Sequence, residues 1–433
     1  MTKSKTYKTK GAAATVTAAV LALIALFGMT ACSNAAQPDA GGNSAGTSTP
    51  KYTIHFSVRS GLGTFKAAVD GKEIHTGDSV EQGKSIVFTA EPDSGYEVGQ
   101  WTNGGTVIDE AGTDKTYTHT VTANAFIRVK FKVLPAPFIE GGASLILDPD
   151  KLDIRVAVTT ADNSPVTVEG CTETTLPSAT ETTLHAKGIV VILKGKITKL
   201  NCGDFDIYGN SNELTDLNVQ GLTALQTLEC CANQLTALNV QGLTALQTLK
   251  CCANQLTALN VQGCTALQTL ECQFNWLTAL NVQGLTSLQE LNCGANRLTA
   301  LNVQGCTALR TLVCGVNQLT ELNVQGLTAL QGLYCGGNQL TALDVQGLTA
   351  LQGLDCHNNR LTAQAFTKIF DDLPQITNYY GNCALYTEKE GVSEGNNTDF
   401  TKPPELQSAF ENAKTVKKWK MYKVNGSGNF SEI

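Results

Sequence analysis

Cysteine is the residue whose number and spacing most suggest chemistry in this chain. The 433 residues include 15 cysteines, and the stretch "LECCANQLTALNVQG" from Leu228 returns at Leu249 as "LKCCANQLTALNVQG". Zinc sites use clusters such as C-x-x-C, and disulfide frameworks use paired cysteines in a small domain. Neither pattern is present. The sequence therefore predicts no metal site and no disulfide scaffold.

The remaining chemistry-bearing residues do not form a catalytic motif. The five histidines are scattered through different parts of the chain, at His55, His75, His119, His185 and His357. No set of Ser, His and acid falls in a recognisable motif, and no glycine-rich phosphate loop occurs. We expect no catalytic residues, no cofactor and no enzyme activity. The formal net charge of −7 argues against nucleic acid as a partner.

Most of the cysteines belong to an internal repeat. They recur at Cys230, Cys251, Cys272, Cys293, Cys314, Cys335 and Cys356, in step with "LNVQG" or "LDVQG" from Leu217 to Leu343. A fixed period, here about 21 residues, indicates a solenoid. In L-x-x-L-x-C the second leucine and the cysteine both point into the core of a strand-built stack, so the thiols act as small apolar fillers. Cys264 and Cys306 replace a leucine of "GLTAL" and are interpreted in the same way.

The unit L-x-x-L-x-C-x-x-N-x-L-T-x-L-N-V-Q-G resembles the leucine-rich repeat, in the short bacterial class. The resemblance implies a solenoid over residues 196–361, with a ladder of asparagines that turns the backbone and bonds to adjacent coils. Cys202 precedes Cys230 by more than one period, so "GDFDIYGNSN" is interpreted as an insertion in the first of eight turns. Long insertions in compact stacks are often functional. The candidates there are Asp204, Phe205, Asp206 and Tyr208, which lack the remaining ligands of a calcium loop.

Positions that vary between turns are free to serve a ligand. Those on and after the first strand should face outward on a concave sheet, because they alternate with core positions. Exposed aromatic residues beside charges are typical of protein-binding surfaces. The candidates are Glu229, Lys250, Glu271, Phe274, Trp276, Arg297, Arg310, Tyr334, Asp355 and His357. Cys231 and Cys252 should also lie side by side on this face, either as free thiols or as a disulfide.

The segments on either side of the repeat have other patterns. Residues 51–133 alternate with period two, and "FTAEPDSGY" with Trp101 resembles the divergent internalin-type B repeat of bacterial surface proteins. That resemblance implies a β-grasp-like spacer with Tyr96 and Trp101 in its core. Residues 134–195 are interpreted as a β-rich cap, since a repeat stack needs an atypical end. Residues 362–433 should form an α/β cap, with helices in "AQAFTKIFDDLPQI" and "PPELQSAFENAKTV".

The start of the chain is typical of an export signal. Four lysines precede an apolar run over residues 11–31, and removal of those lysines would take the net charge from −7 to −11. Met29-Thr30-Ala31-Cys32 resembles a bacterial lipobox, in which the cysteine carries lipid. We expect a signal peptide over residues 1–31, lipid on Cys32 and a flexible tether over residues 32–50. A transmembrane anchor helix is the alternative.

The sequence thus predicts a multi-domain fold: a small β-grasp-like β domain, a leucine-rich repeat solenoid of parallel strands with few helices, and a C-terminal α/β cap. The expected function is that of a lipid-anchored, adhesin-like protein on the outer membrane surface. Its concave sheet would bind a protein or glycan on a host or bacterial surface, with the membrane contacted through the lipid alone. A structural role in the envelope is the main alternative, and a role accessory to an enzyme is a distant third.

Overall fold

The computed structural model describes residues 49–203, 211–377, 379–388 and 395–433. Cys32, the expected signal peptide and the four candidates of the insertion therefore lie outside the described residues. None of the helices that are described is long and apolar enough to cross a bilayer.

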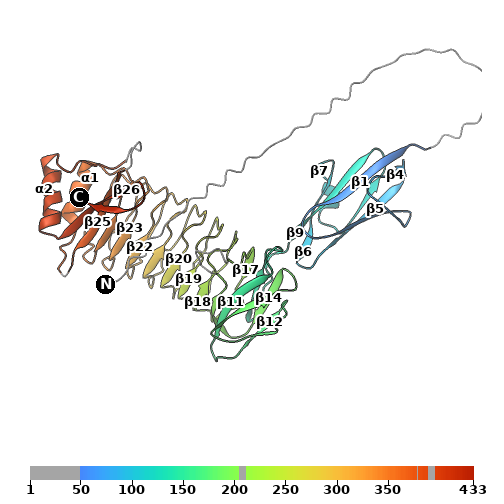
Figure 1. Ribbon diagram of the computed structural model, residues 1–433, viewed down its shortest axis with the longest axis horizontal. Coiled ribbons are helices and arrows are strands. Elements are labelled where there is room, and N and C mark those ends of the chain that lie inside the picture. The colour runs from blue at the N-terminus through green and yellow to red at the C-terminus, as the bar shows by residue number, and fades with distance from the viewer. Residues whose placement is uncertain (1–48, 204–210, 378, 389–394) are drawn as a thin grey trace, which may run out of the picture. The chain divides into compact units, whose positions relative to one another are not determined.

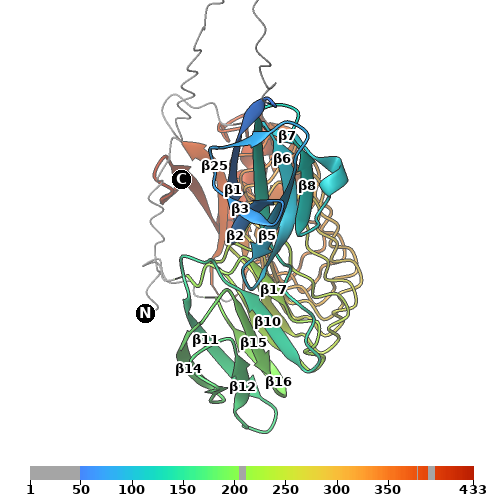
Figure 2. The same ribbon diagram turned by 90° about the vertical axis from the view of Figure 1, so that its right-hand side faces the viewer.

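Residues 51–133 form two sheets that pack against each other (Figure 2). The first has the strand order β4-β1-β9-β6-β7 and the second β3-β2-β5-β8, with the short 3-10 helix η1 before β8. The bounds are β1 Lys51–Ser60, β2 Gly63–Val69, β3 Lys72–Ile74, β4 Asp78–Glu81, β5 Ser85–Pro92, β6 Tyr96–Asn103, β7 Thr106–Val107, η1 Asp109–Ala111, β8 Thr116–Thr120 and β9 Ala125–Val133.

The β-grasp expectation for this module needs correction. No α-helix occurs in residues 51–133, all of which are described. The space that a helix would fill is occupied by aromatic side chains from both sheets, and the ring of Phe65 lies 5.4 Å from that of Trp101. Tyr96 and Trp101 are buried, as predicted. Two faces of apolar side chains thus cover each other and leave no sheet face for a helix to cover.

A β-rich segment connects this module to the repeat. Its strands are β10 Gly142–Ile146, β11 Asp153–Thr160, β12 Val166–Glu169, β13 Thr175–Leu176, β14 Thr180–His185 and β15 Val190–Lys194. Strand β11 pairs with β16 (Ile197–Asn201), the strand of the first turn, and β10 pairs with β17 (Asp216–Asn218) of the same turn (Figure 2). The open end of the repeat stack is therefore covered by antiparallel partners.

The repeat folds as a parallel stack with one short strand per turn (Figure 1). These strands are β18 Thr227–Glu229, β19 Thr248–Lys250, β20 Thr269–Glu271, β21 Glu290–Asn292, β22 Thr311–Val313, β23 Gly332–Tyr334 and β24 Gly353–Asp355. Register confirms the repeat: Leu228 pairs with Leu249, one period on, whereas Leu200 of β16 pairs with Leu228 across the longer step that contains the insertion. The irregular first turn is thus real, and the insertion leaves strand pairing intact.

Asparagines bond the turns together, as the sequence predicted. The Asn254 side chain accepts from the Leu235 N–H at 3.0 Å and donates to the carbonyl oxygen atoms of Cys230 and Cys251 at 2.9 and 3.2 Å. The asparagine ladder has two members that the sequence interpretation did not include. Asn212, the last residue of the insertion, and Asn396 in the C-terminal cap make equivalent bonds to the backbone of Cys202 and Cys356. "SNELTDLNVQG" matches "ANQLTALNVQG", so the repeat itself contained the signal for Asn212.

The C-terminal segment continues the sheet and adds both helices. Its elements are α1 Ala363–Asp372, β25 Gly381–Glu388, α2 Pro404–Thr415, β26 Trp419–Asn425 and β27 Phe430–Glu432, which confirms the two predicted helices (Figure 1). Strand β25 pairs in parallel with β24. One continuous cluster of buried apolar side chains runs from Ala143 through the repeat to Met421. The cap therefore covers the last turn and continues the apolar core of the repeat.

Candidate functional site

In each repeat strand two residues face outward and one faces inward. In β18, Leu228 is fully buried, whereas Thr227 and Glu229 are half-buried on the other side of the sheet. We call the outward side of β18–β24 the strand face. It has two columns, one in line with Thr227 and one in line with Glu229. The remaining side chains of a turn do not belong to the strand face, because they lie in the core or beyond the ends of the strand.

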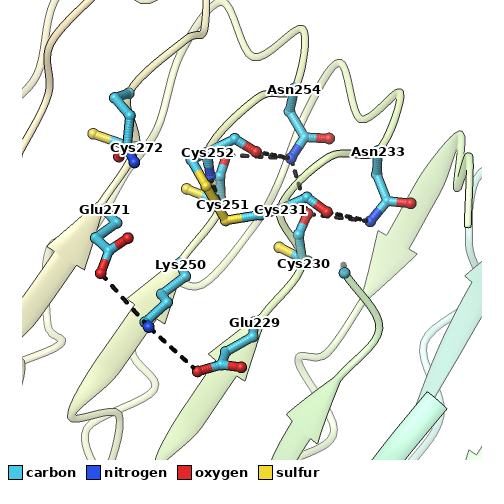
Figure 3. The surroundings of a disulfide bond; sticks show 12 residues. Glu229, Cys230, Cys231, Asn233, Lys250, Cys251, Cys252, Asn254, Glu271 and Cys272 are labelled. Carbon is cyan, nitrogen blue, oxygen red and sulfur yellow. Dashed lines mark hydrogen bonds and ion pairs between the residues drawn. A yellow bond between two sulfur atoms is a disulfide. The ribbon is translucent and has the colours of Figure 1, made fainter. Parts of the chain in front are cut away.

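The amino-terminal part of the strand face is charged. Lys250 lies between Glu229 and Glu271 on neighbouring strands, with its Nζ atom 3.6 Å from a carboxylate oxygen of each (Figure 3). The sequence predicted all three as binding candidates, and the structure brings them together. Partly exposed ion pairs of this kind stabilise a fold by roughly 0–1 kcal/mol each. Their main effect is to hold three charged groups in a row across three turns.

The carboxyl-terminal part of the strand face contains an aromatic ring and a polar pair. Tyr334 is 41% exposed, and Asp355 pairs with it on the neighbouring strand. His357, the second residue after β24, directs its Nδ1 atom at the Asp355 carboxylate and donates its backbone N–H to the same oxygen at 3.3 Å. These three candidates therefore form one group, separate from the charged row.

Phe274 and Trp276 lie beyond the strand face, which corrects their predicted place on the sheet. Strand β20 ends at Glu271, and Phe274 has a left-handed backbone with φ of 57°. The chain therefore bends, and the alternation of a strand no longer applies. Phe274 is 54% and Trp276 43% exposed, and the Arg297 guanidinium lies 5.6 Å from the Trp276 ring. We call Phe274, Trp276 and Arg297 the corner cluster.

Arg310 lies at the edge of the sheet where the strands begin, opposite the edge that carries the corner cluster. It immediately precedes β22, whereas the corner residues follow β20 and β21. In a parallel sheet all strands start at one edge and finish at the other. Arg310 is exposed at the first edge and so does not join the aromatic residues with which it was grouped.

Cys231 and Cys252 form a disulfide and are buried, so the prediction of an outward pair was wrong about exposure (Figure 3). Their side chains are 6% and 3% exposed. Each is the second residue after its strand, where the chain has begun to turn. The bond joins the second and third turns at positions 21 residues apart. The sequence left the choice between free thiols and a bond open, and the structure contains the bond.

The other twelve described cysteines form no disulfide with one another and are buried in the core, including Cys171 and Cys383. Burial raises the pKa of Cys202, Cys251 and Cys293 to about 12, because a thiolate cannot be solvated there. They are therefore poor nucleophiles and poor metal ligands. Among the described residues no group of three His, Cys, Asp or Glu side chains is placed to hold a metal ion.

The comparisons with known proteins agree with part of this description. The profile of the divergent InlB B-repeat domain family matches residues 64–134. The first module is therefore similar to that family, as its aromatic pattern indicated. No curated protein gives a significant match to the chain.

Three solved structures of bacterial proteins are similar to part of the chain. The functional domain of InlJ from Listeria monocytogenes, described as including a cysteine ladder, is 33% identical over 44% of each chain, with a TM-score of 0.38. A leucine-rich repeat protein of Leptospira interrogans is 22% identical over 47% of this chain and 56% of its own, with a TM-score of 0.34. YopM from Yersinia enterocolitica is 24% identical over 35% and 39%, with a TM-score of 0.29. The chain thus covers less than two thirds of each, and the fold described here rests on its own strand register.

Proposed function

We propose that this chain is a lipid-anchored, surface-exposed binding protein of adhesin-like type. Cys32 would carry the lipid, the first module would act as a spacer, and the repeat would bind a protein or glycan on a host or bacterial surface. The similarity of residues 64–134 to the divergent InlB B-repeat domain supports the spacer role. The protein would lie in the cell envelope on the outer membrane, with the insertion as a second contact region.

The corner cluster is the observation that carries the proposal. At the position of Phe274 the other turns have Ala, Val, Gly or Asn, and at the position of Trp276 they have Gln or Arg. Two large aromatic side chains are thus exposed together on a turn whose neighbours have neither. Aromatic residues and arginine are enriched at the centres of binding interfaces. Aromatic side chains also bury much area at little entropic cost.

The disulfide supports export of the chain independently of its start. Disulfides persist in oxidising compartments and are rare in the cytosol, where thioredoxin and glutathione keep thiols reduced. Cys231 and Cys252 are bonded within the repeat itself. The bond therefore supports maturation of the chain outside the cytosol.

Binding of the purified chain without residues 1–32 to host cells and matrix tests the proposal, since the compact unit begins at Pro50. We expect saturable binding, reduced about thirtyfold or more in Phe274→Ala/Trp276→Ala, because a single aromatic hot spot contributes about 2 kcal/mol or more. The matched control is Ala253→Gly/Gln255→Ala, at the same positions one turn earlier. Equal loss in both variants, or in neither, would reject the corner cluster as the contact.

Localisation has a separate test. Protease treatment of intact cells should remove the repeat, because an adhesin faces outward. Protection of the repeat would favour the structural envelope role.

A further inference from the structure

Val316 is exposed at a backbone position that suits valine poorly. It has φ of 55° and is the one β-branched residue with a left-handed backbone in the described part of the chain. This conformation crowds a branched side chain against its own backbone and is rare for valine. Val316 is also 66% exposed, more than any other large apolar side chain of the described repeat. Burial therefore does not offset the strain, and strain of this kind is typical of functional sites.

Val316 occupies the same position of its turn as Phe274. Between them this position holds Ala295, and the backbone N–H groups of Phe274, Ala295 and Val316 donate to carbonyl groups of the next turn at 3.1, 2.9 and 2.8 Å. All three residues have a left-handed backbone. At a strand spacing of about 4.8 Å, their side chains form a row about 10 Å long. We call Phe274, Ala295 and Val316 the apolar strip.

The turns on either side leave the apolar strip uncovered. From β18 to β24 this position holds Ala, Ala, Phe, Ala, Val, Gly and Asn, so apolar side chains larger than alanine occur only in the strip. The glycine is Gly337, where a Cβ atom would lie 3.5 Å from Val316 Cγ2. A larger side chain at residue 337 would contact the valine and cover part of it. Glycine leaves that side of Val316 open to a partner.

The charged residues beside the apolar strip are cationic. In the turns from β20 to β24 the position of Trp276 includes Arg297 and Arg360, and neither it nor the strip position holds a carboxylate. The Arg297 guanidinium lies 5.6 Å from the Trp276 ring and forms no ion pair with a described residue. An arginine that stacks on a ring keeps N–H groups that match a carboxylate. The corner is thus locally cationic on a chain of net charge −7.

We propose that the apolar strip and Arg297 bind an acidic segment of a partner protein. Apolar side chains of the segment would pack on Phe274 and Val316, and a carboxylate would pair with Arg297. A protein segment supplies both kinds of group. A glycan would place hydroxyl groups against Ala295 and Val316, whose side chains offer no hydrogen-bonding atom, and unpaired polar groups lower affinity. This inference rests on the proposed binding function and selects protein over glycan as the ligand.

A synthetic peptide array tests the inference with the chain lacking residues 1–32. The peptides combine apolar residues with either Asp and Glu or Lys and Arg, and neutral oligosaccharides and anionic lipid vesicles form two further arms. We expect binding to the acidic peptides, weakened by salt, and much weaker binding to the basic ones. Arg297→Gln restores the commonest residue of its position and should remove most of this preference.

Two substitutions of Val316 separate binding from folding. Titration with the best acidic peptide in solution should show about tenfold weaker binding for Val316→Asn and for Val316→Thr, because burial of a valine side chain is worth about this factor. Asn358 has φ of 49° at the same position, so Val316→Asn should also raise the urea midpoint, whereas Val316→Thr keeps the branch and should leave it unchanged. Ala232→Asn is the matched control, two turns before Phe274, and should bind the peptide normally.

Normal peptide binding by either Val316 variant overturns the inference. So do an equal loss in Ala232→Asn, equal binding to basic peptides, and binding confined to the oligosaccharides or the vesicles. If no peptide binds, or if the Val316 variants bind normally, while cells are still bound through Phe274 and Trp276, the inference fails and the proposed function stands. If cells are not bound either, both fail.

Discussion

Removal of the Cys231–Cys252 disulfide should destabilise the repeat by a predictable amount. The bond closes a loop between residues 21 apart in the chain. The chain-entropy treatment assigns a cross-link of this length about 3 kcal/mol at 25 °C, because it restricts the unfolded chain. Both side chains are small and buried, so Cys231→Ala/Cys252→Ala leaves little new cavity. We therefore expect the free energy of unfolding to fall by about 3 kcal/mol.

Urea unfolding followed by circular dichroism measures the effect. The oxidised chain, the reduced chain and the double variant are compared, and the last two should coincide. Cys264→Leu/Cys306→Leu is the matched control. It also removes two cysteines, yet it restores the leucine found at Leu243 and Leu285 and leaves the disulfide in place. This control should keep the midpoint of the oxidised chain within the error of the measurement.

Thiol counting gives an independent result. The chain without residues 1–32 retains 14 of the 15 cysteines, of which 12 are free and buried. A thiol reagent should find none in the folded state and 12 after unfolding without reductant. The reasoning is refuted if 14 thiols react after unfolding, or if the double variant and the oxidised chain unfold at the same urea concentration.

Three further predictions concern the Asn ladder, the N-terminal cap and the corner. Asn275→Ala should cost about 3 kcal/mol in urea unfolding, because it leaves backbone groups of three residues without their partner. Glu173, bonded to the backbone and ring of His185, has a pKa lowered to about 2, and the pKa of His185 is raised by the same contact. The stability that this pair contributes should therefore be fully present between about pH 4.5 and 6.5 and should decline as the pH falls toward 2 or rises above 6.5. Thermal melts of Glu173→Gln should lack this contribution at every pH. Phe274→Gly should raise stability by up to about 1 kcal/mol in the same urea assay while weakening cell binding, since its backbone is left-handed.

Each of these three predictions has a control or an outcome that would contradict it. Asn281 is exposed and makes a local turn bond to the backbone of Gln283, so Asn281→Ala should cost well under half as much as Asn275→Ala. A flat pH profile in the unmodified chain would remove the Glu173–His185 argument. A destabilised Phe274→Gly variant would show that the ring contributes to the fold rather than to a ligand.

The sequence predicted the repeat because one physical rule operates throughout it. Each turn has to match its neighbour, so leucines, thiols and asparagines recur with the register that the strands adopt. Both C-terminal helices followed from their apolar spacing, and Phe366, Ile369 and Phe370 of α1 are buried. These features depend on local periodicity and on stacking between identical units. Periodicity alone is sufficient to find them.

The predictions about the repeat that were wrong concern residues beyond the ends of the repeat strands, where stacking periodicity no longer determines the direction of a side chain. Repeat strands have three residues, so alternation between core and surface is valid from Thr248 to Lys250 and ends before Cys252. Cys231 and Cys252 lie beyond the strand ends, where alternation no longer places a side chain, and Phe274 is itself the left-handed residue of its turn. The β-grasp expectation for the first module came from its family resemblance, and the alternating pattern could not test it, because a helix and a second sheet can each cover an apolar sheet face. An alternating pattern does not distinguish them.

The repeat also allows the demands of stacking to be separated from those of ligand binding. Stacking explains a residue that recurs, but it does not explain Phe274, which is large and exposed at a left-handed position where Gly and Asn are better tolerated. Nor does it explain Gly332 and Gly353, which give up the β propensity of threonine. Both departures accompany an exposed aromatic ring: Phe274 is the ring itself, and Gly332 makes room for the ring of Tyr334. Because natural chains depart from such rules mainly at functional sites, a ligand should bind around Phe274 or Tyr334.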